Sequence, residues 1–204
     1  MSTSTPEPGY HHGDLKRALL DAALEMLDEE GAEGIGLREL SRKVGVSAAA
    51  PYRHFRSRQA LLEGVATEGF RRFSAMMAAK EADFAEADQF PAMAEAYVRF
   101  ALVQPALFRL MFSRQIDKQD NKVLHAAAVE AYASLAKAAA REVPDAPSEG
   151  AVIAWSFVHG LAMLLLDEQI LGVSPANSDS LIRNLAQRFA NALRAAVALG
   201  AQVR

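Results

Sequence analysis

Residues that favour helices dominate this chain, and the runs of β-branched residues that are typical of strands are missing. From Gly13 onwards, Leu15, Leu19, Ala22 and Met26 follow one another at steps of four, three and four residues. This spacing places the four apolar side chains on one face of a helix. The sequence therefore predicts an all-α protein.

The same pattern, followed along the chain, predicts about nine helices with short connections and no internal repeat. The first helix begins at Gly13 and ends near Gly31, which is suited to a left-handed cap. The others are expected at 37–44, 47–55, 58–83, 91–103, 105–113, 119–142, 148–171 and 178–199. Turn-forming residues at 87–89, 143–147 and 172–175 separate several of them.

Three features bear on the compartment. The chain contains no cysteine, which excludes disulfides and thiolate metal ligands and is typical of a reducing compartment. Residues 1–9 are polar and are expected to form a disordered tail without a signal peptide. The most hydrophobic stretch, 151–166, is judged too short and too polar to span a bilayer, so we expect a buried helix. We therefore expect a cytoplasmic protein with no membrane partner.

The net charge of −3 argues against a nucleic-acid partner, because such domains are usually basic. The charge is nevertheless unevenly distributed. Residues 38–58 have a net charge of +5, and the other residues together have −8. The basic side chains of this segment are Arg38, Arg42, Lys43, Arg53, Arg56 and Arg58. A solvated helix surface would explain them, but combined with a DNA-binding motif they indicate a DNA-binding face.

Residues 37–55 have the pattern of a helix-turn-helix. Leu37, Leu40 and Val44 share one face of the first short helix, and Gly45 begins the turn. The second short helix opens with the small residues 48–50, so its N-terminal end could enter a major groove. A helix N-terminus also presents free backbone N–H groups to phosphate.

The segments Leu37-Arg-Glu-Leu-Ser-Arg-Lys-Val-Gly-Val-Ser47, Ala50-Pro-Tyr-Arg-His-Phe55 and Ser57-Arg-Gln-Ala-Leu-Leu62 resemble the DNA-binding domain of the TetR/AcrR family. The resemblance covers residues 12 to 70 and implies a DNA-binding domain at 10–60. It implies backbone contacts from Tyr52, His54 and Arg58, and base contacts near Arg38 and the start of the second helix. The full set of expected DNA-binding residues is Arg38, Ser47, Ala48, Ala49, Ala50, Pro51, Tyr52, Arg53, His54 and Arg58.

Residues 61–204 are expected to form an effector-binding and dimerisation domain. The segments Trp155-Ser-Phe-Val-His-Gly160 and Pro105-Ala-Leu-Phe-Arg-Leu-Met-Phe112 resemble a C-terminal domain of this family named after its Trp, His and Gly residues. Helical spacing puts Trp155, His159 and Met163 on one stripe. With Phe100, Leu107, Phe108 and Met111 they could line an apolar cavity for a small molecule. The alternative is ordinary core packing, with the histidine bonded to a core partner.

The last two helices suggest self-association. The helix at 148–171 is apolar nearly all round, which requires burial on more than one side. In the last helix Leu181, Leu185, Phe189 and Leu193 form one stripe, which Ile182, Ala186 and Val197 widen. A single bundle could bury both helices, but the resemblance implies a homodimer with a four-helix interface. Its two recognition helices would lie about 34–36 Å apart, as a palindromic operator requires.

The sequence and the resemblance together predict a ligand-responsive transcriptional regulator, most often a repressor in this family. It would bind double-stranded operator DNA and be released by a small apolar effector, with no cofactor and no metal. One alternative is a DNA-binding regulator without an effector. Another is an enzyme with His159 as base, although helical spacing supplies only apolar neighbours there. His11 and His12 are expected in the tail or at a helix entry, and His125 at the surface or in interhelical packing.

Overall fold

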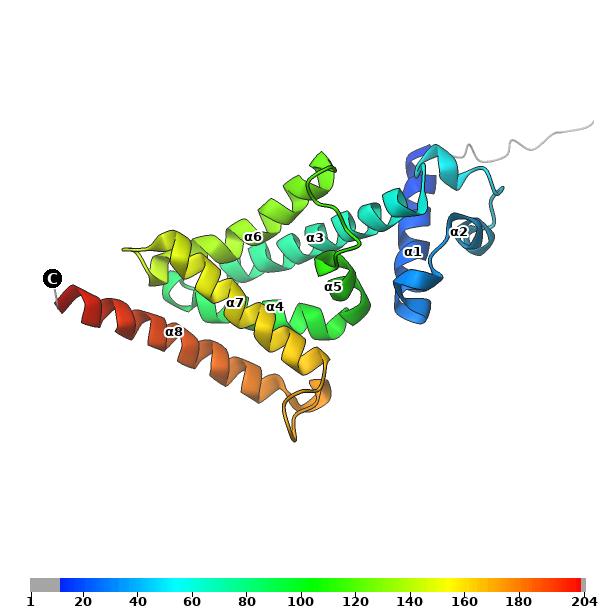
Figure 1. Ribbon diagram of the computed structural model, residues 1–204. Coiled ribbons are helices and arrows are strands. Elements are labelled where there is room, and N and C mark those ends of the chain that lie inside the picture. The colour runs from blue at the N-terminus through cyan, green and yellow to red at the C-terminus, as the bar shows by residue number, and fades with distance from the viewer. Residues whose placement is uncertain (1–11, 203–204) are drawn as a thin grey trace, which may run out of the picture. The chain divides into compact units, whose positions relative to one another are not determined.

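The computed structural model describes residues 12–202, with side chains from residue 15 to residue 196. The predicted tail at 1–9, His11 and the side chains of His12 and Val197 lie outside the described part. Within that part the chain is all-α, as predicted, with eight α-helices, two short 3-10 helices and no strand. Figure 1 shows α1 (His12–Gly34), α2 (Leu37–Val44), η1 (Pro51–Arg53), α3 (Arg58–Asp83), α4 (Glu86–Val103), α5 (Pro105–Phe112), α6 (Lys122–Glu142), α7 (Pro147–Leu166), η2 (Pro175–Asn177) and α8 (Asp179–Gln202).

The chain divides into two compact units, and the division falls between Val65 and Ala66, inside α3. The N-terminal unit contains α1, α2, η1 and the start of α3. The C-terminal unit contains the rest of α3 and α4 to α8. Each unit has a core of its own, because fully buried apolar side chains occur in both.

Three helices form the core of the N-terminal unit. Leu19 of α1, Leu40 of α2 and Leu61 of α3 are fully buried there. At Gly31, where the sequence predicts the end of the first helix, the backbone kinks with φ 72° and ψ 179°. Because a positive φ suits glycine, the predicted break is present, although three further residues complete α1.

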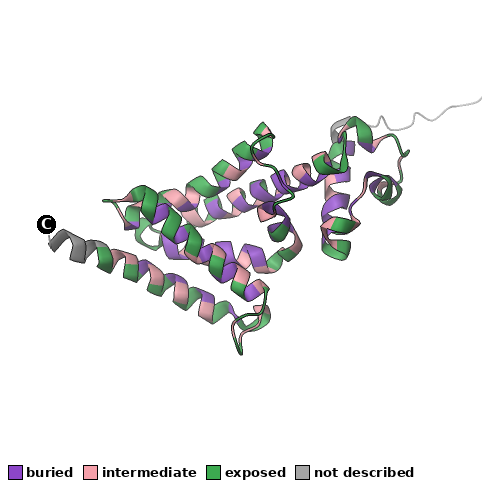
Figure 2. Ribbon diagram, in the orientation of Figure 1, coloured by how far each residue is buried: buried purple, intermediate pink, exposed green. Residues whose placement is uncertain are grey.

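In the C-terminal unit, α4 is central and packs against α5, α6, α7 and α8. Its buried face includes Phe90, Met93 and Tyr97, and α5 adds the fully buried Phe108 and Met111. Figure 2 shows the buried residues of α4 in purple, between more exposed neighbouring helices. A Cβ on Gly69 of α3 would lie only 2.7 Å from Met111 Sδ, so this glycine allows α3 and α5 to approach closely.

The start of α4 differs from the prediction. The turn expected at 87–89 lies inside the helix, and the break falls instead at Phe84 and Ala85. Pro91 is therefore inside the helix rather than at its first position. A proline has no N–H for the carbonyl four residues earlier, here that of Ala87. Arg194 of α8 replaces this donor, with Nη2 lying 2.6 Å from the Ala87 oxygen.

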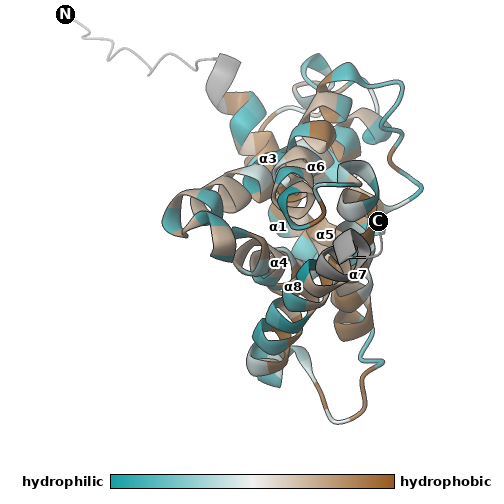
Figure 3. Cartoon of the chain, turned by 90° about the vertical axis from the view of Figure 1, so that its left-hand side faces the viewer, coloured by the Kyte–Doolittle hydropathy of each residue, from teal (hydrophilic) through white to brown (hydrophobic). Residues whose placement is uncertain are grey.

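The expectation that the most hydrophobic stretch is too short and too polar to span a bilayer is wrong, and the helix that contains it is only partly buried in the single chain. At 20 residues, α7 is long and apolar enough to cross a membrane by length and composition alone. It is predominantly apolar (Figure 3), and it packs mainly through one face, against α4 and α6. The opposite face is exposed in the single chain and consists of Val152, Ile153, Ser156, Gly160 and Leu164.

Candidate functional site

The helix-turn-helix of the N-terminal unit is held by a tight turn after α2. Gly45 adopts the left-handed conformation with φ 74° and ψ 33°, which glycine tolerates best. Its N–H donates to the Arg42 carbonyl at 3.2 Å, and the Val46 N–H donates to the Ser41 carbonyl at 3.0 Å. These two bonds close the C-terminal end of α2 and reverse the chain.

The predicted second helix at 47–55 is not an α-helix. Residues 48–50 form a turn and η1 follows. Three of the bonds join residues three apart: Ala50 N to Ser47 O at 2.9 Å, Arg53 N to Ala50 O at 3.2 Å and His54 N to Pro51 O at 3.0 Å. A fourth, Phe55 N to Pro51 O at 2.9 Å, joins residues four apart. Because Pro51 has no N–H for the Ser47 carbonyl, the α-helical pattern is interrupted and the tighter 3-10 geometry replaces it.

Most of the predicted DNA-binding residues lie at the surface of this unit. Pro51 differs from the expectation: it is buried and fixes η1 to the core. Ala50 and His54 are half-buried, and His54 Nε2 is enclosed without a hydrogen-bond partner in the described part of the chain. The exposed residues are Arg38, Ser47, Ala48, Ala49, Tyr52, Arg53 and Arg58.

Part of the local positive charge is neutralised within the unit. Lys43 Nζ lies 3.0 Å from a Glu29 carboxylate oxygen and 3.4 Å from one of Glu25. The hydrogen bond to Glu29, with the nearby negative charges, raises the pKa of Lys43. Arg42 is paired with Glu39 at 3.1 Å. Because Glu39 is already counted in the net charge of +5, only the pairing of Lys43 with two carboxylates outside the segment reduces the positive charge of this surface further.

The remaining arginines differ in their surroundings. Arg38, Arg53 and Arg56 are exposed, and none of them has an ion pair with the residues that the structure describes. Arg58 is engaged with the backbone: Nε donates to the Ile35 carbonyl at 2.8 Å and Nη2 donates to that of Ala32. Arg58 thus fastens the connection between α1 and α2, a role that the sequence did not reveal.

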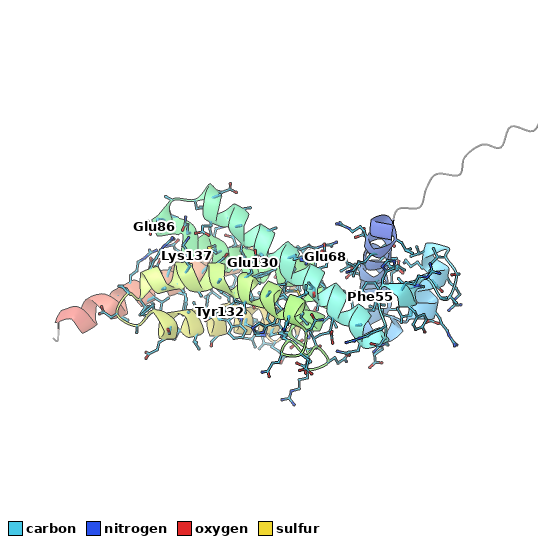
Figure 4. The ribbon with its side chains drawn as sticks, turned by 90° about the horizontal axis from the view of Figure 1, so that it is seen from above. Phe55, Glu68, Glu86, Glu130, Tyr132 and Lys137 are labelled. Carbon is cyan, nitrogen blue, oxygen red and sulfur yellow. The ribbon has the colours of Figure 1, made fainter. Side chains whose placement is uncertain are left out.

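A cavity of about 390 Å³ lies in the C-terminal unit. Aromatic side chains from α3, α4, α5 and α7 surround it, and α6 supplies the largest share of its wall. One of the α6 residues is Tyr132, which Figure 4 labels. The lining residues are Phe70, Phe73, Tyr97, Phe112, Lys118, Gln119, His125, Ala128, Val129, Ala131, Tyr132, Leu135 and Trp155.

Only Trp155 of the predicted ligand-binding residues lines this cavity. The others lie outside it: His159 is half-buried and bonded within the unit, Met163 is half-buried, and the remaining four are core residues, namely Phe100, Leu107, Phe108 and Met111. Sequence reasoning missed α6, although residues 128, 131, 132 and 135 have the spacing of one helical face. Two of these are alanines, which resemble ordinary packing residues.

A polar network adjoins the cavity and corrects the expectation that His159 has only apolar neighbours. Tyr97 Oη lies 3.0 Å from His159 Nδ1, and Trp155 Nε1 donates to the same hydroxyl at 3.2 Å. Since the hydroxyl accepts from Trp155, its own proton can go to His159 Nδ1, which places the imidazole proton on Nε2. Burial raises the pKa of Tyr97 well above its ordinary value, so the hydroxyl keeps its proton.

Lys118, in the loop before α6, brings a cation to the aromatic wall. Its Nζ lies 5.5 Å from the Phe112 ring centre and 5.7 Å from that of Phe70. Burial lowers the pKa of Lys118. Burial, and then the charge of Lys118, lower the pKa of His159. No group of three metal-ligating side chains occurs in the described part of the chain.

The predicted dimer residues of α8, Leu181, Leu185, Phe189 and Leu193, are half-buried in the single chain. Phe189 stacks on Phe157 of α7 with ring centres 4.0 Å apart, so part of this stripe packs within the chain. The deeper face of α8 is formed by Ile182, Ala186 and Ala190, which are buried. The exposed face of α7 was not predicted, because the sequence alone did not show which side of this helix meets α4 and α6.

Two family models match the chain. A model described as bacterial regulatory proteins of the tetR family matches residues 19–65, and a model described as a tetracyclin repressor-like C-terminal domain matches residues 90–199. A solved structure of a protein with unknown function from Rhodococcus sp. RHA1 has 31% sequence identity and a TM-score of 0.79, covering 92% of this chain and all of that one.

Other relatives are more distant or cover less. The TetR family transcriptional regulator PfmR from Thermus thermophilus is 17% identical with a TM-score of 0.58, over 83% of this chain and 94% of that one, so it shows the fold alone. The uncharacterized HTH-type transcriptional regulator YobS of Bacillus subtilis is 29% identical over 107 residues, which are 52% of this chain and 56% of YobS. The class D tetracycline repressor of Escherichia coli is 38% identical over 53 residues, 26% of this chain and 24% of the repressor. The chain thus spans about half the length of one curated relative and a quarter of the other.

Proposed function

Because the chain belongs to the TetR family and is a DNA-binding transcriptional regulator rather than an enzyme, we propose that it binds a palindromic operator as a homodimer and is released by a small molecule. The observation that carries the ligand response is the 390 Å³ cavity in the C-terminal unit. It favours an effector over the alternative of a regulator without one, because the aromatic side chains leave the space open.

The DNA contacts are assigned from exposure and free charge. Arg38 and Arg53 are exposed and have no carboxylate partner in the described chain, so their guanidinium groups are available to base edges or phosphates. Tyr52 has half of its surface exposed and is assigned to the DNA backbone. Residues 47–50 would approach the DNA major groove through small side chains. His54 and Arg58 are assigned to DNA from the family resemblance alone, because His54 is half-buried and Arg58 is bonded to the backbone. Pro51, being buried, is assigned to support rather than to contact.

The proposed dimer uses the exposed face of α7 together with the half-buried stripe of α8. Val152, Ile153 and Leu164 would leave water on association, which is favourable in proportion to the apolar area buried. Nothing lies within 4 Å of a Cβ placed on Gly160, so a second helix can approach this point closely. In the proposed dimer, the second copy would cover the exposed apolar face of α7.

An effector in the cavity would alter operator affinity by favouring one conformation of the dimer over another. α3 contains both Arg58 of the N-terminal unit and the cavity-lining Phe70 and Phe73, so it provides a continuous path. Such couplings are typically about 1–3 kcal/mol, which requires the effector to bind the two states roughly 5–150-fold differently. The proposal has three further parts: the chain acts as a repressor, it is cytoplasmic, and its C-terminal domain is of the Trp-His-Gly type. Trp155 and His159 on α7 support the last of these.

Operator selection from random DNA, followed by binding measurements on the selected sequence, tests the proposal. We expect an approximately palindromic site that one dimer occupies, and we expect Arg53→Met to weaken binding while leaving the fold and the dimer intact. The matched control is Arg188→Met, which changes an exposed arginine of α8 outside the DNA-binding unit. A selected site without two-fold symmetry, or occupied by a monomer, would contradict the proposed assembly.

A further inference from the structure

The lining of the cavity is asymmetric in charge. Among the described residues that line it, Lys118 is the only lysine or arginine, and no aspartate or glutamate is present. Gln119, its neighbour in the loop, and His125, from the first turn of α6, also reach the cavity. The remaining lining residues are apolar or aromatic. The cavity therefore combines an apolar wall with one cation and two further polar side chains.

Lys118 has no counter-charge. It forms no ion pair with any residue that the structure describes, and its nearest recorded partners are the rings of Phe70 and Phe112. Ring faces offset the loss of water around an ammonium group only in part. Partial burial of a charge without a partner costs free energy, and the lowered pKa of Lys118 expresses the same cost. A negatively charged ligand group would supply the missing counter-charge and thereby remove this free-energy cost.

We propose that the cavity takes a small aromatic or aliphatic acid, whose carboxylate pairs with Lys118 while its apolar body lies against the rings of the wall. This inference rests on the proposed function and names the chemical class of its effector. A cationic ligand would be repelled by the ammonium group, and a neutral one would leave it without a counter-charge. Gln119 and His125 provide further hydrogen-bond donors for the carboxylate. The volume of 390 Å³ lies within the range that is usual for small-molecule sites.

The test compares two ligands of the same size that share one apolar body, the charged 4-phenylbutyrate and its neutral amide, by titration calorimetry on the full chain. Trp155 is the only tryptophan and lines the cavity, so its fluorescence provides a second readout. Because a hydrogen bond to a charged partner is stronger than a neutral one, we expect the acid to bind about tenfold more tightly. Lys118→Met should abolish this preference and Lys118→Arg should retain it. The matched control is Lys122→Met, an exposed lysine that does not line the cavity.

Each outcome either supports or overturns the inference that the cavity selects for a negatively charged ligand. Equal affinities for acid and amide, tighter binding of the amide, or an acid preference that survives Lys118→Met would overturn the inference and leave a cavity without charge selectivity. Failure of both compounds to bind would also overturn the assignment. None of these results affects the proposed operator binding and dimerisation, because operator selection and dimerisation are measured without any ligand.

Discussion

Tyr97 of α4 and His159 of α7 share a hydrogen bond of 3.0 Å between Oη and Nδ1, and Trp155 donates to the same hydroxyl. One hydroxyl thus satisfies two ring nitrogens from a neighbouring helix. Because Tyr97 is only 2% exposed, bulk water cannot take the place of its hydroxyl as a hydrogen-bond partner. The bond fixes the register of α4 against α7 beside the cavity.

Removal of this hydroxyl should destabilise the C-terminal unit. In Tyr97→Phe the side chains of Trp155 and His159 lose their shared partner, and a part-buried donor or acceptor left unpaired costs about 1–3 kcal/mol. The free energy of unfolding, measured by urea titration, should fall by an amount in this range. Tyr132→Phe is the matched control, because that tyrosine is exposed. An equal loss in both variants would contradict the special role of Tyr97.

The pH dependence of stability should reflect His159. Burial and the charge of Lys118 lower its pKa in the folded chain, so the unfolded chain binds more protons as the pH falls below about 6.5. The free energy of unfolding should therefore decrease with falling pH in this window, until the folded histidine is protonated as well. In His159→Gln this part of the slope should disappear. His125→Gln, in which an exposed histidine of the cavity is replaced, should keep it.

The helices were largely predictable, because their apolar spacing and their glycine and proline boundaries lie in the local sequence. The start of α4 was not. Pro91 resembles a first helical residue, and only the three-dimensional structure supplies Arg194, a residue 107 positions from Ala87, as the missing donor. At Pro91 the disruptive effect of a proline on the helix was overestimated, and in the segment 47–55 it was underestimated. Pro51 was expected to cost at most one early hydrogen bond, but it interrupts the α-helical pattern.

The DNA-binding segment was predictable as a pattern. An apolar cavity in the C-terminal half was predicted as well, but only Trp155 of the predicted residues lines the cavity that the structure contains. Trp155 was identified from its motif, whereas Lys118 lies in an irregular loop without periodicity, and Tyr97 looks like an ordinary core aromatic in the sequence. The ion pairs of Lys43 with Glu25 and Glu29 could not be predicted either, because these residues of α1 lie 18 and 14 positions before Lys43 and only the packing of α1 against α2 brings them together. Local sequence patterns are sufficient to predict helices. A site that is formed by several helices can be identified only once the packing of those helices is known.

Arg194 should contribute to stability through two partners. Its Nε lies 2.5 Å from Glu142, whose side chain is only 6% exposed, and Nη2 donates to the Ala87 carbonyl. In Arg194→Met the buried carboxylate loses its cation. Since the arginine itself is partly exposed, solvent reduces the loss below the full value for a buried pair, and we expect about 1–3 kcal/mol. The double variant with Glu142→Gln should recover part of it; the absence of any recovery would contradict the pairing.

Lys43 and Arg53 should contribute unequally to DNA binding, although both belong to the basic segment. Lys43 is already paired with Glu25 and Glu29, whereas Arg53 is exposed without an ion pair in the described chain. If Arg53 contacts a phosphate, Arg53→Met should reduce the slope of log affinity against log salt by about 1. Lys43→Met should change the slope less. Operator titrations at several salt concentrations measure both, and equal effects would show that net charge alone governs binding.

The exposed face of α7 gives opposite expectations for stability and assembly. Gly160 has open space around its Cβ position in the single chain, and a helical glycine costs about 0.8–1.0 kcal/mol relative to alanine. Gly160→Met should therefore leave the fold intact or stabilise it. If a second copy packs closely on this face, the same variant should convert the dimer to a monomer in light scattering after gel filtration. Ala78→Met, at an exposed alanine of α3, controls for added surface hydrophobicity. A Gly160→Met protein that remains dimeric would place the interface elsewhere.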